Sequence, residues 1–135
     1  YSLTSYKSMD YVAFDEWCRF NATQAEIAVI EHPYASARGE GFGLLGQGIN
    51  FGYALGTLGS HFKRVESIGP SQWKCALKVS GKKDNTRSIE IASALVGLKT
   101  LIPPRCRVPN MGLVDAILIG YYGYLNFFGL DEDQD

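Results

Sequence analysis

AEIAVIEH, residues 25–32, is a short apolar run that ends in two polar residues. Its length and its branched residues Ile27, Val29 and Ile30 favour a buried strand over a helix. Glu31 stands at the carboxyl end of this predicted strand, where α/β proteins usually place their chemistry. The alternative interpretation is a polar strand end that faces water.

Helical patterns flank this strand on both sides. The segment YVAFDEWCRFN, residues 11–21, is predicted to form a helix in which Val12, Trp17 and Phe20 share one face. The glycine-rich segment ARGEGFGLLGQGINFGYALGTLGSH, residues 37–61, is also interpreted as a helix. Its expected apolar side consists of Phe42, Leu45, Ile49, Tyr53 and Leu58. Its glycines would let another backbone come close, at a cost of about 1 kcal/mol each in helix propensity.

The remaining segments continue the alternation and then become helical. HFKRVESIG, residues 61–69, is predicted as a second strand, and PSQWKCALKV, residues 70–79, as a short helix with Ser71 as its N-cap. SGKKDNTRSIEIASALVGL, residues 80–98, begins as a basic turn and becomes an amphipathic helix. Its inner stripe is expected to hold Ile89, Ala92 and Val96. After three prolines, Asn110 is expected to cap the last helix.

This order of strands and helices predicts an α/β fold. Two strands are too few for a stable sheet, so further strands are expected either before Tyr1 or from a partner. The length of 135 residues fits a single domain, which we expect to be incomplete at its N-terminus. Residues 129–135 form an acidic tail.

Composition narrows the classes of protein that the chain could be. With a net charge of −1, the chain has no overall positive field that would attract nucleic acid. Basic residues nevertheless cluster around residues 74–87 and 105–107. Cys18, Cys75 and Cys106 have no CxxC spacing and suggest reduced thiols of an intracellular or organellar protein. No run is long and apolar enough to predict a membrane span.

A second carboxylate, Asp115, lies in the apolar stretch NMGLVDAILIGYYG, residues 110–123. We expect it in the first turn of the last helix, where the helix dipole favours a negative charge. A capping-turn Asp with no other task is the alternative. A carboxylate among such apolar neighbours needs a cation, a donor or a metal. Glu31 and Asp115 would suit acid–base work, or binding of Mg²⁺ or Mn²⁺ through oxygen ligands.

Five segments in order resemble the RuvC-like Holliday junction resolvases, most closely their plant-organelle (monokaryotic-chloroplast) branch. The resemblance covers residues 28–124 and rests on AVIEH, GFGLLGQGINFGYALGTL, VESIGPSQWKCAL, SGKKDNTRSIEIASAL and GLVDAILIGYYG. Each segment is short, but their order and spacing are fairly specific. The resemblance implies an RNase H-like mixed sheet flanked by helices, whose first strands are missing from this chain.

The resemblance also implies a function. Family members cut four-way DNA junctions as dimers with two Mg²⁺ (or Mn²⁺) ions, which implies branched DNA as the partner and an organelle, mitochondrion or chloroplast, as the location. If the roles of the family's residues are carried over to this chain, the resemblance implies that Glu31 and Asp115 are catalytic metal ligands. It also implies that Asn110 occupies a further ligand position and that Lys83 is a catalytic cation near the phosphate. The implied nucleic-acid contacts are Arg38, Trp73, Lys74, Lys82, Lys83 and Arg87.

Three departures from the family pattern leave two interpretations open. The first strand with its Asp is absent, and Asp10 and Asp15 lie in helix-like surroundings. Asn110 stands where the plant-organelle branch has an Asp, and His32 follows Glu31 where the family usually has Gln. The chain is therefore either a nuclease whose missing strand lies upstream, or an inactive RuvC-like scaffold that binds RNA or protein subunits of a large organellar assembly.

Overall fold

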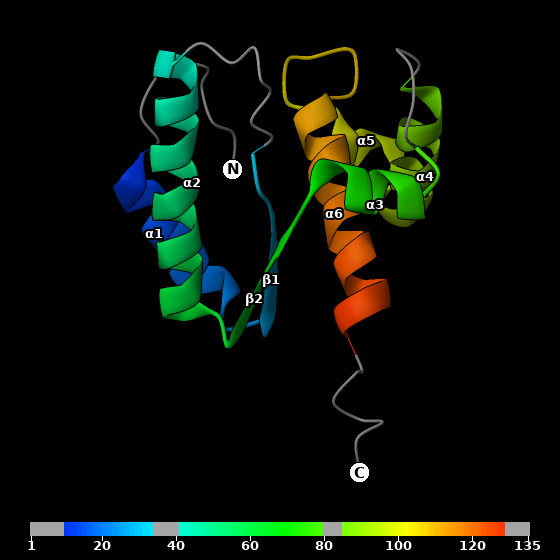
Figure 1. The fold of residues 1–135 in the computed structure, drawn as a ribbon. Helices are drawn as coiled ribbons and strands as arrows, with labels where there is room; N and C mark the ends of the chain where they lie inside the picture. The colour runs from blue at the N-terminus through cyan, green and yellow to red at the C-terminus, as the bar shows by residue number, and fades with distance from the viewer. Residues whose placement is uncertain (1–9, 34–40, 80–84, 129–135) are drawn as a thin grey trace. The chain divides into compact units, whose positions relative to one another are not determined.

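The computed structural model describes residues 10–33, 41–79 and 85–128, with side chains given from residue 45 onward in the second range. The chain divides into two compact units, Tyr1–Pro70 and Ser71–Asp135, and each is described by itself. The described elements are, in chain order, α1 (Tyr11–Asn21), β1 (Ile27–Glu31), α2 (Gly41–His61), β2 (Arg64–Ile68), α3 (Pro70–Ala76), α4 (Thr86–Val96), α5 (Leu98–Leu101) and α6 (Met111–Phe127) (Figure 1). The predicted α/β class is confirmed, with helix predominating.

The first unit is built on a parallel pair of strands. β1 and β2 pair in register from Ile27 opposite Arg64 to Glu31 opposite Ile68, and α2 is the crossover between them. A parallel pair needs such a long connection because the chain must return to the end of the sheet at which the first strand begins. Both predicted strands are confirmed, and among the described residues they make up the whole sheet.

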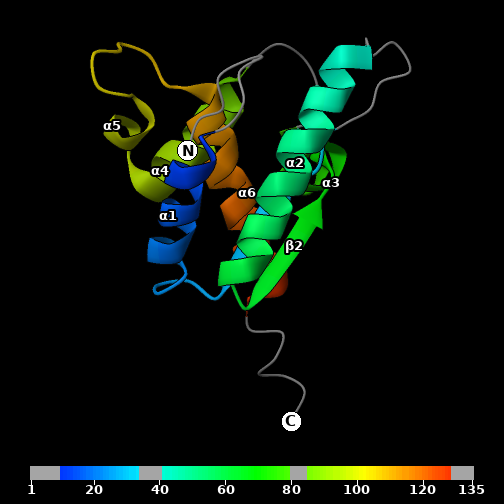
Figure 2. The same ribbon diagram turned by 90° about the vertical axis from the view of Figure 1, so that its left-hand side faces the viewer.

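Helices α1 and α2 cover one face of this pair. The core consists of Phe14 and Cys18 from α1, Ala54 and Leu58 from α2, and Phe62 just after α2. Ala28, Ile30 and Val65 pack against this core from the strands. Figures 1 and 2 show α1 and α2 on the same side of β1 and β2. Because side chains alternate along a strand, Ile27, Val29 and Glu31 point to the opposite face.

The strand β1 is less buried than its sequence predicts. All five of its residues are half-buried, whereas the apolar run predicts full burial. Ala28 and Ile30, which pack against the helix core, are half-buried like Ile27, Val29 and Glu31 on the other face.

The two helices of this unit form as predicted but bury different faces. In α1, Val12 is 71% exposed and Phe20 64% exposed, while Phe14 and Cys18 are buried. In α2, Leu45 and Ile49 are 63% and 53% exposed, and the buried positions lie nearer the C-terminal end. Tyr53 is also exposed, Leu58 is buried as expected, and the side chain of Phe42 lies outside the described residues.

Five glycines in the described part of α2 do not provide the close backbone approach that the sequence suggests. A Cβ atom at any of these glycines would have no neighbouring atom within 4 Å. They are Gly46, Gly48, Gly52, Gly56 and Gly59. Within this structure their helix-propensity cost is therefore not offset by tight packing.

The second unit is helical. α4 packs on α5 and on α6, and the amide of Gln72 in α3 donates to the hydroxyl of Tyr122 in α6 over 2.9 Å. The backbone N–H of Asn110 donates to the carbonyl of Leu101, which ties the start of α6 to the end of α5. α6 buries Val114, Leu118 and Tyr122 on one face at helical spacing.

Two expectations for this unit are wrong, and one short helix is new. Pro70 opens α3, so Ser71 lies inside the helix instead of capping it, because proline suits the first helical position. In α4, Ala92 is buried as expected. The other buried residue of this helix is Ser88, whereas Val96, which was expected on the inner stripe, is 38% exposed. The four-residue helix α5 was not predicted, and the acidic tail lies outside the described residues.

None of the helices in the described part of the chain has the length and apolar character needed to cross a membrane.

Candidate functional site

Glu31 closes β1 at the carboxyl end of the parallel pair. It lies opposite Ile68, the last residue of β2, and its side chain is half-buried. Its face of the sheet also carries the ion pair between Arg64 Nε and Glu66 Oε1, at 2.7 Å. The position at the carboxyl end agrees with the sequence prediction and is where parallel sheets present ligand-binding residues.

His32 extends this edge by one residue. Its backbone N–H donates to the carbonyl of Ile68 over 2.9 Å, and its Nδ1 lies 3.3 Å from the hydroxyl of Ser67. The side chain therefore makes a local hydrogen bond at the strand end. Sequence reasoning gave no indication of Ser67, because the pairing register that brings it to His32 is a long-range property.

Asp115 lies just beyond the first turn of α6, and not within that turn as the sequence predicts. The helix begins at Met111, so Asp115 is its fifth residue and the first turn contains no acid. The macrodipole effect falls off within the first turn, so the prediction of a first-turn Asp and the alternative of a capping-turn Asp are both wrong. The side chain is half-buried among buried Val114 and Leu118.

Asn110 is the N-cap of α6, as predicted. Its Oδ1 accepts a hydrogen bond from the N–H of Leu113 over 3.1 Å. Gly112 leaves room for this arrangement, because a Cβ there would lie 3.0 Å from that oxygen. The side-chain oxygen that a metal would need thus also caps the N-terminus of α6.

The predicted nucleic-acid residues lie around α3 and α4. Trp73 is buried, with 1% exposure, and the ammonium of Lys74 lies 5.4 Å from its ring centroid. A ring so enclosed supports Lys74 by packing and cation–π attraction. Arg87 is exposed in the first turn of α4, and its Nε donates to the carbonyl of Lys78 over 3.0 Å. Arg38, Lys82 and Lys83 lie outside the described residues.

Glu31 belongs to the first unit and Asp115 to the second, so a metal site shared by the two acids stays a prediction. Among residues 10–33, 41–79 and 85–128, no three His, Cys, Asp or Glu side chains form a group that could hold a metal ion. Carboxylate oxygens are nonetheless the donors that Mg²⁺ and Mn²⁺ prefer.

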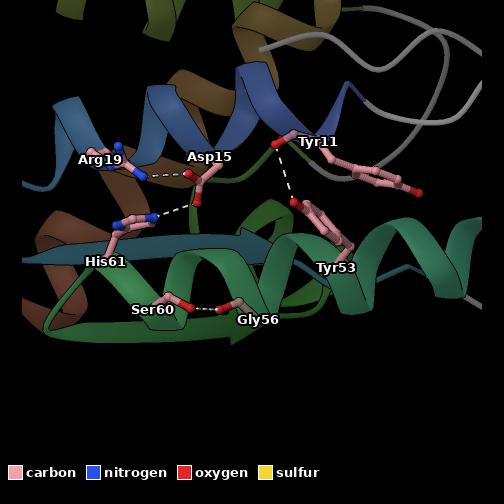
Figure 3. Close-up of polar contacts among 7 residues, drawn as sticks. All are labelled: Tyr11, Asp15, Arg19, Tyr53, Gly56, Ser60 and His61. Carbon is pink, nitrogen blue, oxygen red and sulfur yellow. Dashed lines mark hydrogen bonds and ion pairs between the residues drawn. The ribbon is translucent and has the colours of Figure 1, made fainter.

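A polar cluster in the first unit was not predicted. Asp15 of α1 lies between His61, whose Nε2 is 2.8 Å from Oδ1, and Arg19, whose guanidinium is 3.2 Å from Oδ2 (Figure 3). The hydrogen bond from His61 is the main cause that lowers the pKa of Asp15, and the charges of His61 and Arg19 add to it. Burial raises the pKa of the neighbouring Cys18 thiol, and the charge of Asp15 raises it further. The helix contacts of Asp10 and Asp15 agree with their expected helix-like surroundings.

In comparison with known proteins, no family model matches this chain, and no curated protein matches it significantly.

Proposed function

We propose that the chain is a RuvC-like, Mg²⁺-dependent endonuclease that cuts four-way DNA junctions, with Glu31 and Asp115 as metal ligands. The observation that carries the proposal is the position of Glu31. It is half-buried at the carboxyl end of a parallel β–α–β unit, on the face that α1 and α2 leave uncovered. The RNase H-like fold is part of the proposal and is supported by this unit together with the order of the five segments.

The chemistry assigned to the residues follows from their charges. Bound Mg²⁺ would activate water and stabilise the leaving oxygen at the scissile phosphate. Glu31 and Asp115 would hold the ions through their oxygens, and Lys83 would add positive charge near the phosphate. Lys74, placed on the Trp73 ring, would contact the DNA backbone together with Arg38, Lys82 and Arg87. Two copies would act together, because a four-way junction is cut on two strands symmetrically.

The test is cleavage of a synthetic four-way junction in the presence of Mg²⁺. Wild-type protein is expected to cut it, and Glu31→Gln and Asp115→Asn are expected to lose cleavage while staying folded by circular dichroism. Glu26→Gln is the matched control for the first unit, because Glu26 is exposed and pairs with exposed Lys63 at 3.1 Å. Glu90→Gln is the matched control for the second unit, because Glu90 is also exposed. Cleavage that persists at the wild-type rate in Glu31→Gln and Asp115→Asn would contradict the proposal.

One observation favours a second candidate, a non-catalytic RuvC-like subunit of an organellar assembly that contacts RNA or protein. The neutral Oδ1 of Asn110 already accepts a hydrogen bond from the Leu113 N–H, which makes it a weaker ligand for a second metal than a carboxylate oxygen would be. This candidate predicts no cleavage, together with weak junction binding. A nuclease that neutralises many phosphates should instead lose affinity steeply as salt rises, since it releases counterions on binding. Junction binding measured between 50 and 200 mM salt, about the range over which this effect is large, separates the two candidates.

A further inference from the structure

His32 is joined to the end of β2 through both its backbone and its ring. The backbone bond to the Ile68 carbonyl, at 2.9 Å, continues the strand pairing one residue beyond Glu31. The ring contact to Ser67, at 3.3 Å, adds a second connection on the neighbouring strand. Glu31 therefore lies between Ile30, which is paired with Ser67, and His32, which is bound to the same strand.

Gly69 supplies the space that the ring occupies. A Cβ at this position would lie 3.2 Å from Nε2 of His32, which is tighter than an ordinary van der Waals contact, and 3.4 Å from Cε1. The backbone of Gly69 is outside the left-handed region, so its conformation does not require glycine. A side chain at this position would therefore displace the imidazole from its place beside Gly69.

The ring of His32 and the carboxylate of Glu31 point to opposite faces of the sheet. Ser67 is the register partner of Ile30, which packs toward α1 and α2, so the His32 ring lies toward that side. Successive strand residues alternate, which places the Glu31 carboxylate on the other face. His32 can therefore influence a ligand at Glu31 through the backbone that the two residues share, and not as a ligand beside it.

We propose that His32, Ser67 and Gly69 form a clamp that positions Glu31, with His32 as a positioning residue. The proposal rests on the proposed function for the identity of the ligand, a divalent cation at Glu31. Strand ends fray unless they are tied down, and a frayed end would spread the carboxylate over many positions. A metal site needs its ligands held to within about 0.5 Å. The clamp fixes the Cα–Cβ direction of Glu31 by closing the strand end directly after it.

The first experiment measures the clamp itself, by amide hydrogen exchange at His32 in the full chain. Ser67→Ala and Gly69→Ala are expected to speed exchange of the His32 amide about five- to tenfold, as its bond to Ile68 opens more often. Ser60→Ala is the matched control for the hydroxyl, because that hydroxyl donates to the Gly56 carbonyl inside α2. Gly59→Ala is the control for the added methyl, because a Cβ there meets nothing within 4 Å. Exchange at His32 that is unchanged in both clamp variants would overturn the proposal.

The second experiment measures the consequence for the metal, by junction cleavage over a range of Mg²⁺ concentrations. Both clamp variants and His32→Ala are expected to need several-fold more Mg²⁺ for half-maximal cleavage, while the rate at saturating Mg²⁺ recovers. His32→Gln should restore the wild-type requirement, because its amide can still hydrogen-bond Ser67. A purely structural loss of folded protein would lower the rate at every Mg²⁺ concentration and would not be rescued by Gln.

The outcomes separate the two proposals. Wild-type protein that cuts no junction overturns the proposed function and the metal-positioning role, while amide exchange still decides whether the clamp holds the strand end. Wild-type cleavage with an unchanged Mg²⁺ requirement in all three clamp variants overturns the metal-positioning role of His32 and leaves the proposed function standing.

Discussion

The Nε2 atom of His61 lies 2.8 Å from Oδ1 of Asp15 (Figure 3). This contact joins α2 to α1 through two residues that are 46 positions apart in the chain. The side chain of His61 is 18% exposed, and that of Asp15 is 37% exposed. Tyr53 adds a second link, since its hydroxyl donates to the Tyr11 carbonyl over 3.4 Å. The polar edge of the α1–α2 interface thus lies beside the apolar core formed by Phe14 and Leu58.

The first prediction is a pH-dependent contribution of Asp15 to stability. Its pKa is lowered in the folded protein, chiefly by the His61 hydrogen bond, while an unfolded Asp titrates at about 3.9. The contribution is therefore fully present above about pH 4 and is lost as the pH falls through the depressed folded value. In urea unfolding, Asp15→Asn should be less stable than wild type at pH 7, and the difference should shrink toward pH 3. Glu16→Gln, an exposed neighbour on α1, should show no such trend. A difference that is constant with pH would refute the assignment.

The second prediction concerns the face of α2 that carries the core. Leu58 is 6% exposed and packs in the core cluster, whereas Leu45 on the same helix is 63% exposed. Leu58→Ala should lower the free energy of unfolding by about 2–5 kcal/mol, through lost burial and the cavity that remains. Leu45→Ala should change it by no more than about 0.5 kcal/mol. Equal losses measured in urea for the two variants would show that the core has been placed on the wrong side of α2.

The third prediction concerns the reactivity of the three thiols. Cys18 is buried and its pKa is raised by burial and by Asp15, while Cys75 and Cys106 are exposed. Because the thiolate is the reactive species, Cys75 and Cys106 should react quickly with a thiol reagent such as dithionitrobenzoate, and Cys18 only after unfolding. A variant with Cys75→Ala and Cys106→Ala should lose the fast phase entirely. A fast phase that survives in this variant would mean that Cys18 of α1 is not buried in the core against Ala54 and Leu58 of α2.

Apart from the short helix α5, the elements of the fold could be predicted from local sequence pattern, but not every buried face could be. The apolar run ending at Glu31 correctly predicted a strand. In α1, the predicted stripe of Val12, Trp17 and Phe20 followed the large apolar side chains, whose spacing of five and three spreads them around the helix. The buried Phe14 and Cys18, spaced by four, follow the helical period better and contact α2. That spacing was visible in the sequence.

The candidate site was predictable only where it depended on position within an element. The end of β1 placed Glu31 correctly, and the polar residue before α6 identified Asn110 as the cap. The contacts of His32 with Ser67 and of Asp15 with His61 depend on strand register and on helix packing, which join residues 35 and 46 positions apart. No local pattern encodes such pairs.

The last prediction concerns Asn110, where helix stability and metal binding make different demands on one side chain. Asn110→Ala removes the acceptor for the Leu113 N–H and should cost about 0.5–2 kcal/mol in the free energy of unfolding. Gly112→Ala should also be destabilising, because its methyl would lie 3.0 Å from the capping oxygen. Asn110→Asp keeps the acceptor, and its negative charge should add about 0.3–1 kcal/mol of stability at the helix N-terminus.

The same Asn110→Asp variant bears on the proposed function, because an Asp has a second oxygen. One oxygen can cap α6 while the other remains available to a divalent cation, whereas the Asn amide nitrogen offers no lone pair to a metal. If the chain is a nuclease, Asn110→Asp should lower the Mg²⁺ concentration needed for half-maximal junction cleavage. If it is an inactive scaffold that lost this ligand, Asn110→Asp should be more stable and still fail to cut. An Asn110→Asp protein that is less stable than wild type would contradict the capping geometry on which both expectations depend.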